Sequence, residues 1–212
     1  LVAFEQVILT RTTEDNRELR RLLEGSRISC VEHPSVAFRW LPDSEKQISE
    51  TLNSKKVDVC AFTSRRGVQG ISKQLQEFIA RETCIAAVGH ATAKAVKELL
   101  GRDPDTVPAE QTGEALARAI IAKPDQPSVV LHLCGKRVNP VFAELLAAAG
   151  MRVIRIPIYE NIEPEVLPPE IVKSSIVIVS SGTAVDRFLR NNDVRAKHLA
   201  FVAIGDVTGD YL

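Results

Sequence analysis

Short apolar runs alternate with amphipathic stretches along this chain of 212 residues. The runs are rich in β-branched residues, and most are apolar throughout, which is typical of strands that are covered on both faces of a sheet. The stretches between them repeat apolar residues at helical spacing. The pattern predicts strands over residues 7–10, 57–63, 84–88, 129–133, 153–158, 176–179 and 201–204.

Four of the predicted helices have a clear apolar face, and a glycine follows three of them. Glycine is favoured just after a helix because it adopts left-handed backbone angles without a steric penalty. Strands that alternate with such helices indicate an α/β fold with parallel sheets. The apolar faces are Leu19, Leu22 and Leu23; Ile71, Leu75, Phe78 and Ile79; Val96, Leu99 and Leu100; and Phe142, Leu145, Leu146 and Ala149, and the glycines are Gly25, Gly101 and Gly150.

An internal repeat divides the chain into two similar halves. Residues 62–68 match residues 179–185 at a separation of 117, and residues 88–93 match residues 204–209 at a separation of 116. Two matches at nearly one offset indicate two copies of one α/β unit. We therefore predict two flavodoxin-like lobes with parallel sheets, related by internal duplication.

The repeat also predicts where the lobes begin and end. Lobe one is expected to be discontinuous, with residues 1–33 and 162–212, and lobe two to cover residues 40–158. The chain then crosses between the lobes twice, so the linkers, residues 34–39 and 159–161, are predicted to run side by side. A cleft between the lobes is the expected binding site.

Hydroxyl side chains follow the predicted strands at the start of helices. Thr63-Ser64 and Ser180-Ser181 are a matched pair, and Thr92 and Thr208 occupy matched positions in the second repeat. One explanation is simple capping of helices, which needs only a hydroxyl oxygen. The other is ligand binding, because the carboxyl ends of parallel strands are where α/β sheets bind ligands.

These turns suit a ligand with several carboxylates. Helix N-termini supply backbone N–H donors and a positive dipole end. Basic side chains at or after strand ends can add charge-assisted hydrogen bonds, although each is also explained as a solvated surface residue. They are Arg11, Arg65, Arg66, Lys136 and Arg137.

Charge and composition exclude several classes of protein. Lys plus Arg equals Asp plus Glu at 27 each, so no basic field favours a nucleic-acid or membrane partner. No run is long enough to span a bilayer, and no basic-then-apolar leader opens the chain. The four cysteines lack the spacing of a zinc site or a compact disulfide framework, so a reducing cytoplasm is expected. The four histidines also lack the spacing of metal ligands. Dinucleotide, P-loop and nucleophile-elbow motifs are absent.

Short motifs in a fixed order resemble those of the uroporphyrinogen-III synthase family. The resemblance runs along essentially the whole chain. The order and duplication of the motifs make the set more specific than any single motif. The motifs are VILTR at 7–11, FTS at 62–64, AVGxxTA at 87–93, IYE at 158–160, VSS at 179–181 and AIGxxT at 203–208.

The resemblance implies an activity and roles for particular residues. Family members convert hydroxymethylbilane, a linear tetrapyrrole with eight carboxylates, into uroporphyrinogen III with loss of water and inversion of ring D, and they need no cofactor or metal. Tyr159 would assist departure of the hydroxyl. A monomer is expected, as is a tail of lobe one beyond residue 212. The substrate would be bound by Thr63, Ser64, Thr92, Ser180, Ser181, Thr208, Arg11 and Arg65.

Two other readings of the sequence remain open. The first is a synthase-like sensor or binding module that holds a tetrapyrrole or another small polyanion without turnover. The second is a flavodoxin-like or periplasmic-binding-like pair of lobes for an unrelated metabolite. Formation of isomer III separates the enzyme from both.

Overall fold

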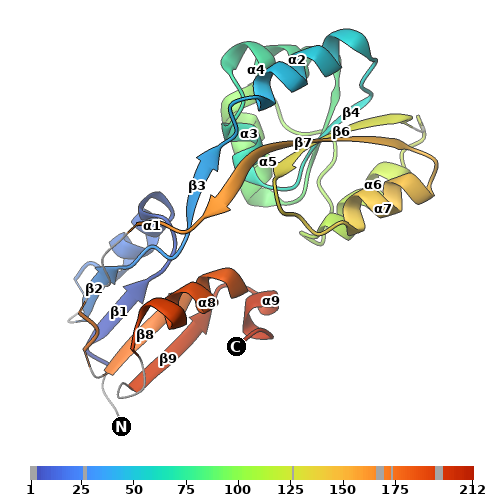
Figure 1. Ribbon diagram of the computed structural model, residues 1–212. Coiled ribbons are helices and arrows are strands. Elements are labelled where there is room, and N and C mark those ends of the chain that lie inside the picture. The colour runs from blue at the N-terminus through green and yellow to red at the C-terminus, as the bar shows by residue number, and fades with distance from the viewer. Residues whose placement is uncertain (1–3, 26–27, 126, 166–169, 173, 194–197) are drawn as a thin grey trace. The chain divides into compact units, whose positions relative to one another are not determined.

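The computed structural model describes residues 4–25, 28–125, 127–165, 170–172, 174–193 and 198–212. The chain divides into two compact units (Figure 1). Unit 1 is discontinuous and combines Leu1–Phe38 with Ile162–Leu212, whereas unit 2 is the continuous segment Arg39–Asn161.

A five-stranded sheet forms the centre of unit 2. Its strand order is β3-β7-β6-β4-β5, and the β7–β6, β6–β4 and β4–β5 pairs are parallel. The carboxyl ends of these four parallel strands therefore meet at one edge. The strands are β3 (Ala37–Trp40), β4 (Val59–Phe62), β5 (Cys84–Ala87), β6 (Val129–Gly135) and β7 (Arg152–Ile162).

Helices cover both faces of this sheet and make unit 2 a three-layer structure. Buried residues of four helices pack on one face and buried residues of two on the other. The first group is α2 (Ser44–Ser54), α3 (Arg65–Gln69), α4 (Lys73–Glu82) and α5 (His90–Leu100), and the second is α6 (Gly113–Ile121) and α7 (Val141–Ala148).

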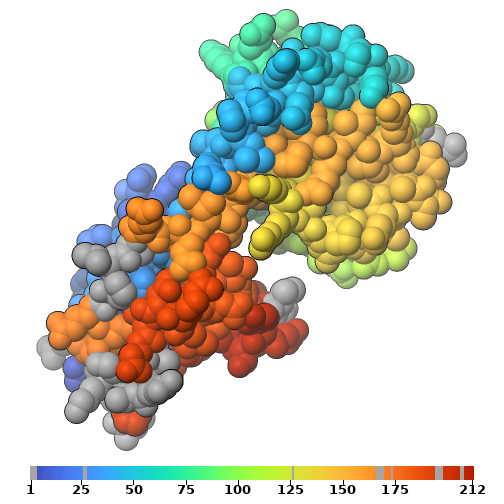
Figure 2. Space-filling model, in the orientation of Figure 1, coloured from blue at the N-terminus to red at the C-terminus, as the bar shows by residue number. Residues whose placement is uncertain are grey.

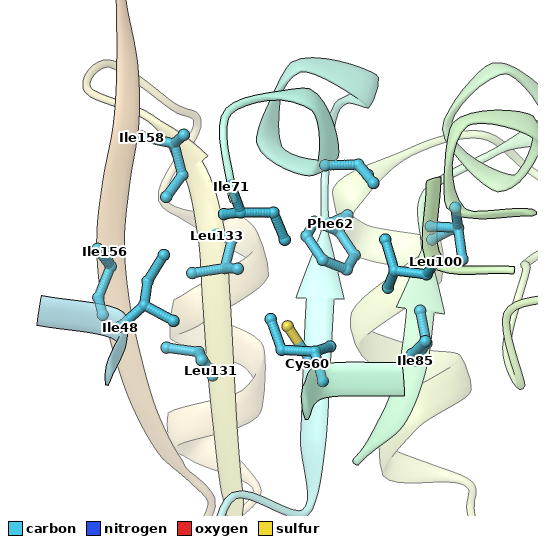
Figure 3. Packing of buried hydrophobic residues seen from close by; sticks show 14 of the residues in the cluster. Ile48, Cys60, Phe62, Ile71, Ile85, Leu100, Leu131, Leu133, Ile156 and Ile158 are labelled. Atoms are coloured by element: carbon cyan, nitrogen blue, oxygen red, sulfur yellow. The ribbon is translucent and has the colours of Figure 1, made fainter. Parts of the chain in front are cut away.

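Successive residues of β4 contribute to opposite cores. Cys60 and Phe62 pack with the helices of the first group, whereas Val59 and Ala61 pack beneath α6 and α7. Figure 3 shows Cys60 and Phe62 pointing into the first core beside residues from β5, β6 and β7. Because side chains alternate along a strand, burial of both faces requires the continuous apolar runs of the sequence.

Unit 1 has a smaller parallel sheet with the order β2-β1-β8-β9. Its core joins Ile8 and Val177 of the sheet to Val185 and Phe188 of α8. The outer side of α8 lies at the surface (Figure 2), where Leu189 is exposed. The elements are β1 (Gln6–Leu9), α1 (Thr13–Leu23), β2 (Ser29–Glu32), β8 (Ser174–Val179), α8 (Gly182–Asn191), β9 (His198–Ala203) and α9 (Asp206–Gly209).

The predicted strands and the parallel α/β class are confirmed. Gly25, Gly101 and Gly150 have φ angles of 91°, 73° and 84°, so each takes the left-handed conformation expected after a helix. The predicted apolar face of α1 is wrong at Leu22, which is 76% exposed. The buried residue of that helix is instead Asn16, whose side-chain amide donates to the carbonyl of Arg11 at 2.9 Å.

Four elements were not predicted from the sequence. β2 and β3 carry polar or charged residues within four-residue strands, so they lack a continuous apolar run. α2 has few apolar residues, and only Ser44 and Ile48 of it are buried. α6 is rich in alanine and isoleucine, and its buried residues are Leu116, Ala117 and Ile120.

Residues predicted as linkers belong in part to strands. Residues 37–39 lie in β3 and residues 159–161 lie in β7, and these strands are neighbours in the five-stranded sheet. Within the described part of the chain, no helix is both long and apolar enough to cross a membrane.

Candidate functional site

Two predicted site residues, Ser64 and Tyr159, are in contact at the carboxyl edge of the unit 2 sheet. Ser64 caps α3 from extended backbone, and its Oγ accepts a hydrogen bond from the N–H of Gly67 at 3.3 Å. The same Oγ lies 2.9 Å from the hydroxyl of Tyr159. The predicted capping role is therefore confirmed, and it is combined with a contact to the predicted catalytic side chain.

Tyr159 lies on β7 opposite Gly135 of β6, where the register of the two strands shifts. A Cβ atom at Gly135 would stand 3.1 Å from Cζ of Tyr159 and 3.2 Å from its hydroxyl. These separations are tighter than ordinary packing, so the missing side chain of Gly135 makes room for the phenol ring. The ring of Trp40 approaches the ring of Tyr159 edge-on, with centroids 6.2 Å apart.

Basic groups surround the carboxylate that follows Tyr159. Lys136 Nζ donates to Glu160 Oε2 at 2.9 Å, and Arg39 donates to the other carboxylate oxygen. Hydrogen bonds from Lys136 and then from Arg39 lower the pKa of Glu160. Lys136, predicted as a possible anion contact, is thus engaged with a carboxylate of its own chain.

Thr63 contacts a buried histidine that the sequence analysis did not select. Its Oγ1 lies 2.8 Å from Nε2 of His132 on β6. His132 is 1% exposed and packs on Phe142, with ring centroids 4.5 Å apart. Burial and, to a smaller extent, the charge of Arg155 lower the pKa of His132 to about 4. A polar residue inside an otherwise apolar strand was the signal in the sequence, but its partner was not visible there.

Thr92 is buried in the first turn of α5 and does not cap that helix. The N-cap is Gly89, whose backbone is extended, and the N–H of His90 donates to Gln111 Oε1 at 3.1 Å. A Cβ atom at Gly89 would stand 2.3 Å from the same Gln111 oxygen. The expectation that this turn repeats the hydroxyl cap of Ser64 is therefore wrong, because glycine and the Gln111 amide take its place.

Ser181 of unit 1 repeats the capping geometry of Ser64. Its backbone is extended, and its Oγ accepts from the N–H of Ala184 at 3.2 Å. Ser180 precedes it directly after β8, and Thr208 is buried in α9. The turn before α9 contains Gly205, whose φ of 98° differs from the extended backbone of Gly89.

The two predicted arginines differ in their surroundings. Arg11 lies after β1 in unit 1 and forms an ion pair with Asp15 at 3.7 Å. Arg65 is the first residue of α3 in unit 2 and is half-buried. Each therefore stands beside a strand end, as predicted, and Arg11 is paired with a carboxylate of the helix that follows it.

The predicted residues lie after strand ends in both units, and one pair of them is in contact. Unit 2 brings Ser64 and Tyr159 into contact and holds Thr63 next to them in the chain. Unit 1 holds Arg11, Ser180, Ser181 and Thr208 after the ends of β1, β8 and β9.

A hollow of about 610 Å³ in unit 2 contains none of the predicted residues. It is lined by residues that precede or begin β4, β5 and β6, at the opposite edge of the sheet. Two of its carboxylates serve the fold, because Asp58 accepts from the N–H groups of Ser128 and Val129, both at 2.9 Å, and Asp105 accepts from that of Ile85. Among the described residues, no cluster of His, Cys, Asp or Glu could hold a metal ion.

Fold and site define a class: a parallel α/β protein of two units, with hydroxyl side chains at the strand ends where such sheets bind small molecules. The sequence model described as uroporphyrinogen-III synthase HemD matches residues 17–212. The chain therefore belongs to the uroporphyrinogen-III synthase family.

Two curated relatives are similar over nearly the whole chain. A protein of Methanocaldococcus jannaschii, provisionally named a uroporphyrinogen-III synthase, is 28% identical over 96% of this chain and 86% of its own length. The porphyrin biosynthesis protein HemD of Ruminiclostridium josui is 25% identical over 97% of this chain. The chain spans 43% of the length of that second protein.

Two solved structures share the fold. The uroporphyrinogen-III synthetase of Helicobacter pylori has a TM-score of 0.66 at 16% identity, covering 98% of this chain and 87% of that one. A triple mutant of the uroporphyrinogen III synthase of Thermus thermophilus has a TM-score of 0.64 at 18% identity, covering 97% and 87%. The family predicted from the sequence is confirmed, and the alternative of a silent binding module is not favoured.

Proposed function

We propose that this chain catalyses the reaction of its family, the closure of hydroxymethylbilane to uroporphyrinogen III. The C–O bond of the terminal hydroxymethyl group breaks and water leaves. The electrophile that forms is captured by ring D at its substituted carbon, and the resulting spiro intermediate fragments and recloses with that ring inverted. The product differs from the substrate by one molecule of water, so no oxidant, reductant or cofactor is required.

One observation at the site carries the assignment of Tyr159. Its hydroxyl lies 2.9 Å from Ser64 Oγ, which also accepts from the N–H of Gly67. Ser64 therefore fixes the phenol oxygen at the edge where the strands end. A phenol has a pKa near 10 in water, so Tyr159 would act as a hydrogen-bond donor to the departing hydroxyl more than as a strong acid.

Substrate binding is assigned mostly to neutral donors on both units, together with two arginines. The carboxylates would accept from hydroxyls and from N–H groups at helix starts, which explains how a chain with 27 basic and 27 acidic residues could bind a polyanion. Holding a flexible substrate in one folded geometry can lower the activation free energy by roughly 7–11 kcal/mol. The binding residues proposed are Thr63, Ser64, Thr92, Ser180, Ser181, Thr208, Arg11 and Arg65.

The wider organisation is proposed from the same observations. The two lobes, residues 1–33 with 162–212 and residues 40–158, would descend from one duplicated unit, and residues 34–39 and 159–161 would connect them. The matching cap geometries of Ser64 and Ser181 support the duplication. A monomer acting in the cytoplasm, without a nucleic-acid or membrane partner, fits the balanced charge.

Product identity tests this function. The purified protein is incubated with freshly generated hydroxymethylbilane, and isomers I and III are separated and quantified. We expect isomer III to form faster than isomer I forms spontaneously. Isomer I alone, at the spontaneous rate, would reject the enzymatic function, and binding of the substrate without isomer III would identify a binding module instead.

A further inference from the structure

His132 is a buried polar side chain to which the proposed reaction gives no role. It lies on β6, opposite Ala61 of β4, in the layer beneath α6 and α7. Its Nε2 is 2.8 Å from Thr63 Oγ1. Its Nδ1 is buried and has no hydrogen-bond partner within the part of the chain that the structure describes. A buried polar atom of this kind needs a physical explanation.

The unpaired Nδ1 decides which way the hydrogen bond to Thr63 runs. A neutral imidazole carries one N–H, and a hydroxyl can either donate or accept. If Nδ1 carried the hydrogen, a buried N–H donor would lack an acceptor, which is rarer and more costly than an unpaired lone pair. The favoured tautomer therefore carries the hydrogen on Nε2 and donates it to Thr63 Oγ1.

His33 of unit 1 provides the opposite case. Its Nδ1 is also buried without a partner among the described residues, but its Nε2 faces the side-chain nitrogen of Asn192 at 2.8 Å. That nitrogen is the amide donor, since it also donates to the carbonyl of Phe188 at 2.8 Å. An amide N–H cannot accept, so Nε2 of His33 must accept and its hydrogen must be on Nδ1. The two buried histidines are expected to be opposite tautomers.

We infer that His132 is a positioning residue for substrate: it donates from Nε2 to Thr63 and thereby turns the Thr63 hydroxyl hydrogen toward a carboxylate of the ligand. An oxygen that accepts from His132 must give its own hydrogen to a different group, and a carboxylate only accepts. This inference rests on the proposed function and adds a residue to it. The lowered pKa of His132, with burial as its main cause, keeps the ring neutral near pH 7, and Phe142 holds it in place.

Kinetics of matched variants test the inference. His132→Leu removes the donor, and His132→Gln offers an amide N–H in place of the ring N–H. We expect the KM for hydroxymethylbilane to rise about tenfold in His132→Leu and to stay within about threefold of wild type in His132→Gln, because one hydrogen bond to a charged group is lost in the first only. A histidine with a merely structural role would lower the melting temperature and leave KM unchanged, which would overturn the inference.

A double-mutant cycle shows whether His132 acts through Thr63. Thr63→Val should raise KM by a factor similar to that of His132→Leu, and the double variant should be no worse than Thr63→Val alone. Multiplicative effects would overturn the inference. Formation of isomer III by the wild-type protein is scored in the same assay, so a failure of the proposed function is distinguished from a failure of the role of His132.

Nitrogen-15 NMR of the wild-type protein tests the tautomer directly. Long-range spectra of the four histidine rings at pH 7 show which ring nitrogen bears the hydrogen. We expect Nε2–H for His132 and Nδ1–H for His33, with His132→Gln used to assign the signal. Nδ1–H at His132 would overturn the inference.

Discussion

The two hydroxyl-pair turns share one backbone device but differ in what surrounds it. In both, a serine in extended backbone caps the helix after a strand, with Oγ 3.3 Å from the N–H of Gly67 in unit 2 and 3.2 Å from that of Ala184 in unit 1. In unit 2 both hydroxyls also contact side chains of other strands, His132 of β6 and Tyr159 of β7. Capping therefore explains the serines of both units, whereas the contacts with His132 and Tyr159 belong to unit 2.

Each turn also has one of the two tyrosines of the chain beside it, and the two phenol hydroxyls have different partners. The ring of Tyr211 lies against Gly182, where a Cβ atom would stand 2.8 Å from it, and its hydroxyl donates to Asp186. The hydrogen bond to Asp186 raises the pKa of Tyr211. Tyr159 contacts a neutral serine instead. The comparison teaches that a shared capping motif can have different side-chain partners in the two units, and the following experiments test what that difference contributes to the proposed function.

The largest expected effect concerns the buried histidine of unit 2 in acid. The unfolded chain protonates His132 near pH 6.5, whereas the folded unit does so only near pH 4. Its contribution to stability is therefore complete above pH 6.5 and is lost as the pH falls toward 4. In His132→Gln the free energy of unfolding should fall less between pH 7 and pH 4 than in wild type, by on the order of 3 kcal/mol. Urea unfolding of unit 2 at the two pH values, followed by Trp40 fluorescence, measures this difference.

An exposed histidine of the same unit is the control. His90 begins α5 with its side chain in solvent, so His90→Gln should leave the pH dependence of unfolding as it is in wild type. An unchanged pH dependence in His132→Gln would contradict the assignment of a neutral, buried ring.

Removal of each tyrosine hydroxyl tests the functional contrast. Tyr159→Phe should lower kcat about 100-fold, the lower part of the range for a group that assists proton transfer. Tyr211→Phe should leave kcat within about twofold, because the hydroxyl it loses is bound to Asp186. Rates of isomer III formation measure both effects. Equal losses of kcat would contradict the proposal that Tyr159, but not Tyr211, takes part in the reaction.

The two buried threonines of the proposed binding set, Thr92 and Thr208, should differ in their effect on binding. Thr92→Val keeps the shape of the side chain and removes one hydroxyl, so KM should rise about tenfold if that hydroxyl binds a carboxylate. Thr208→Val should have a smaller effect, because α9 has four residues and α5 has eleven, and a shorter helix presents fewer aligned dipoles. A larger effect at Thr208, measured in the same initial-rate assay, would reverse the ranking.

The smallest effects are expected from loss of the helix caps. Ser64→Ala and Ser181→Ala should each cost about 1 kcal/mol of stability, as measured by urea unfolding. Thr112→Ala is a matched control, since Thr112 caps α6 through the N–H of Ala115 at 3.1 Å. It should lose similar stability and keep its activity, whereas Ser64→Ala should also slow isomer III formation.

The sequence predicted most of the fold because its strands are buried on both faces. Runs such as residues 57–63 and 129–133 are largely apolar, with Asp58, Thr63 and His132 as the polar exceptions, and their strands and parallel class are confirmed. The apolar face of α1 was misread at Leu22, since spacing gives the face of a helix but not whether anything covers it. β2 and β3 were missed because short strands with polar residues have no periodic signal.

The candidate site was predicted in its residue types but not in its contacts. Thr63, Ser64 and Tyr159 were selected from motifs, and the contact between Ser64 and Tyr159 depends on the pairing of β4, β6 and β7. His132 lies 69 residues from Thr63 in sequence, and only the register of β4 and β6 brings the two together. A single sequence does not contain that register.

The discontinuity of unit 1 sets the order in which the protein can fold during synthesis. The four parallel strands of unit 2 pair with one another and with β3, which precedes them in the chain, so the core of unit 2 can close once β7 has left the ribosome. In unit 1, β1 pairs with β8, and Gln6 has Ser175 as its partner. The first strand of the chain must therefore wait, with one edge unpaired, while all of unit 2 is translated. That interval is when the nascent chain is most open to aggregation and to chaperones.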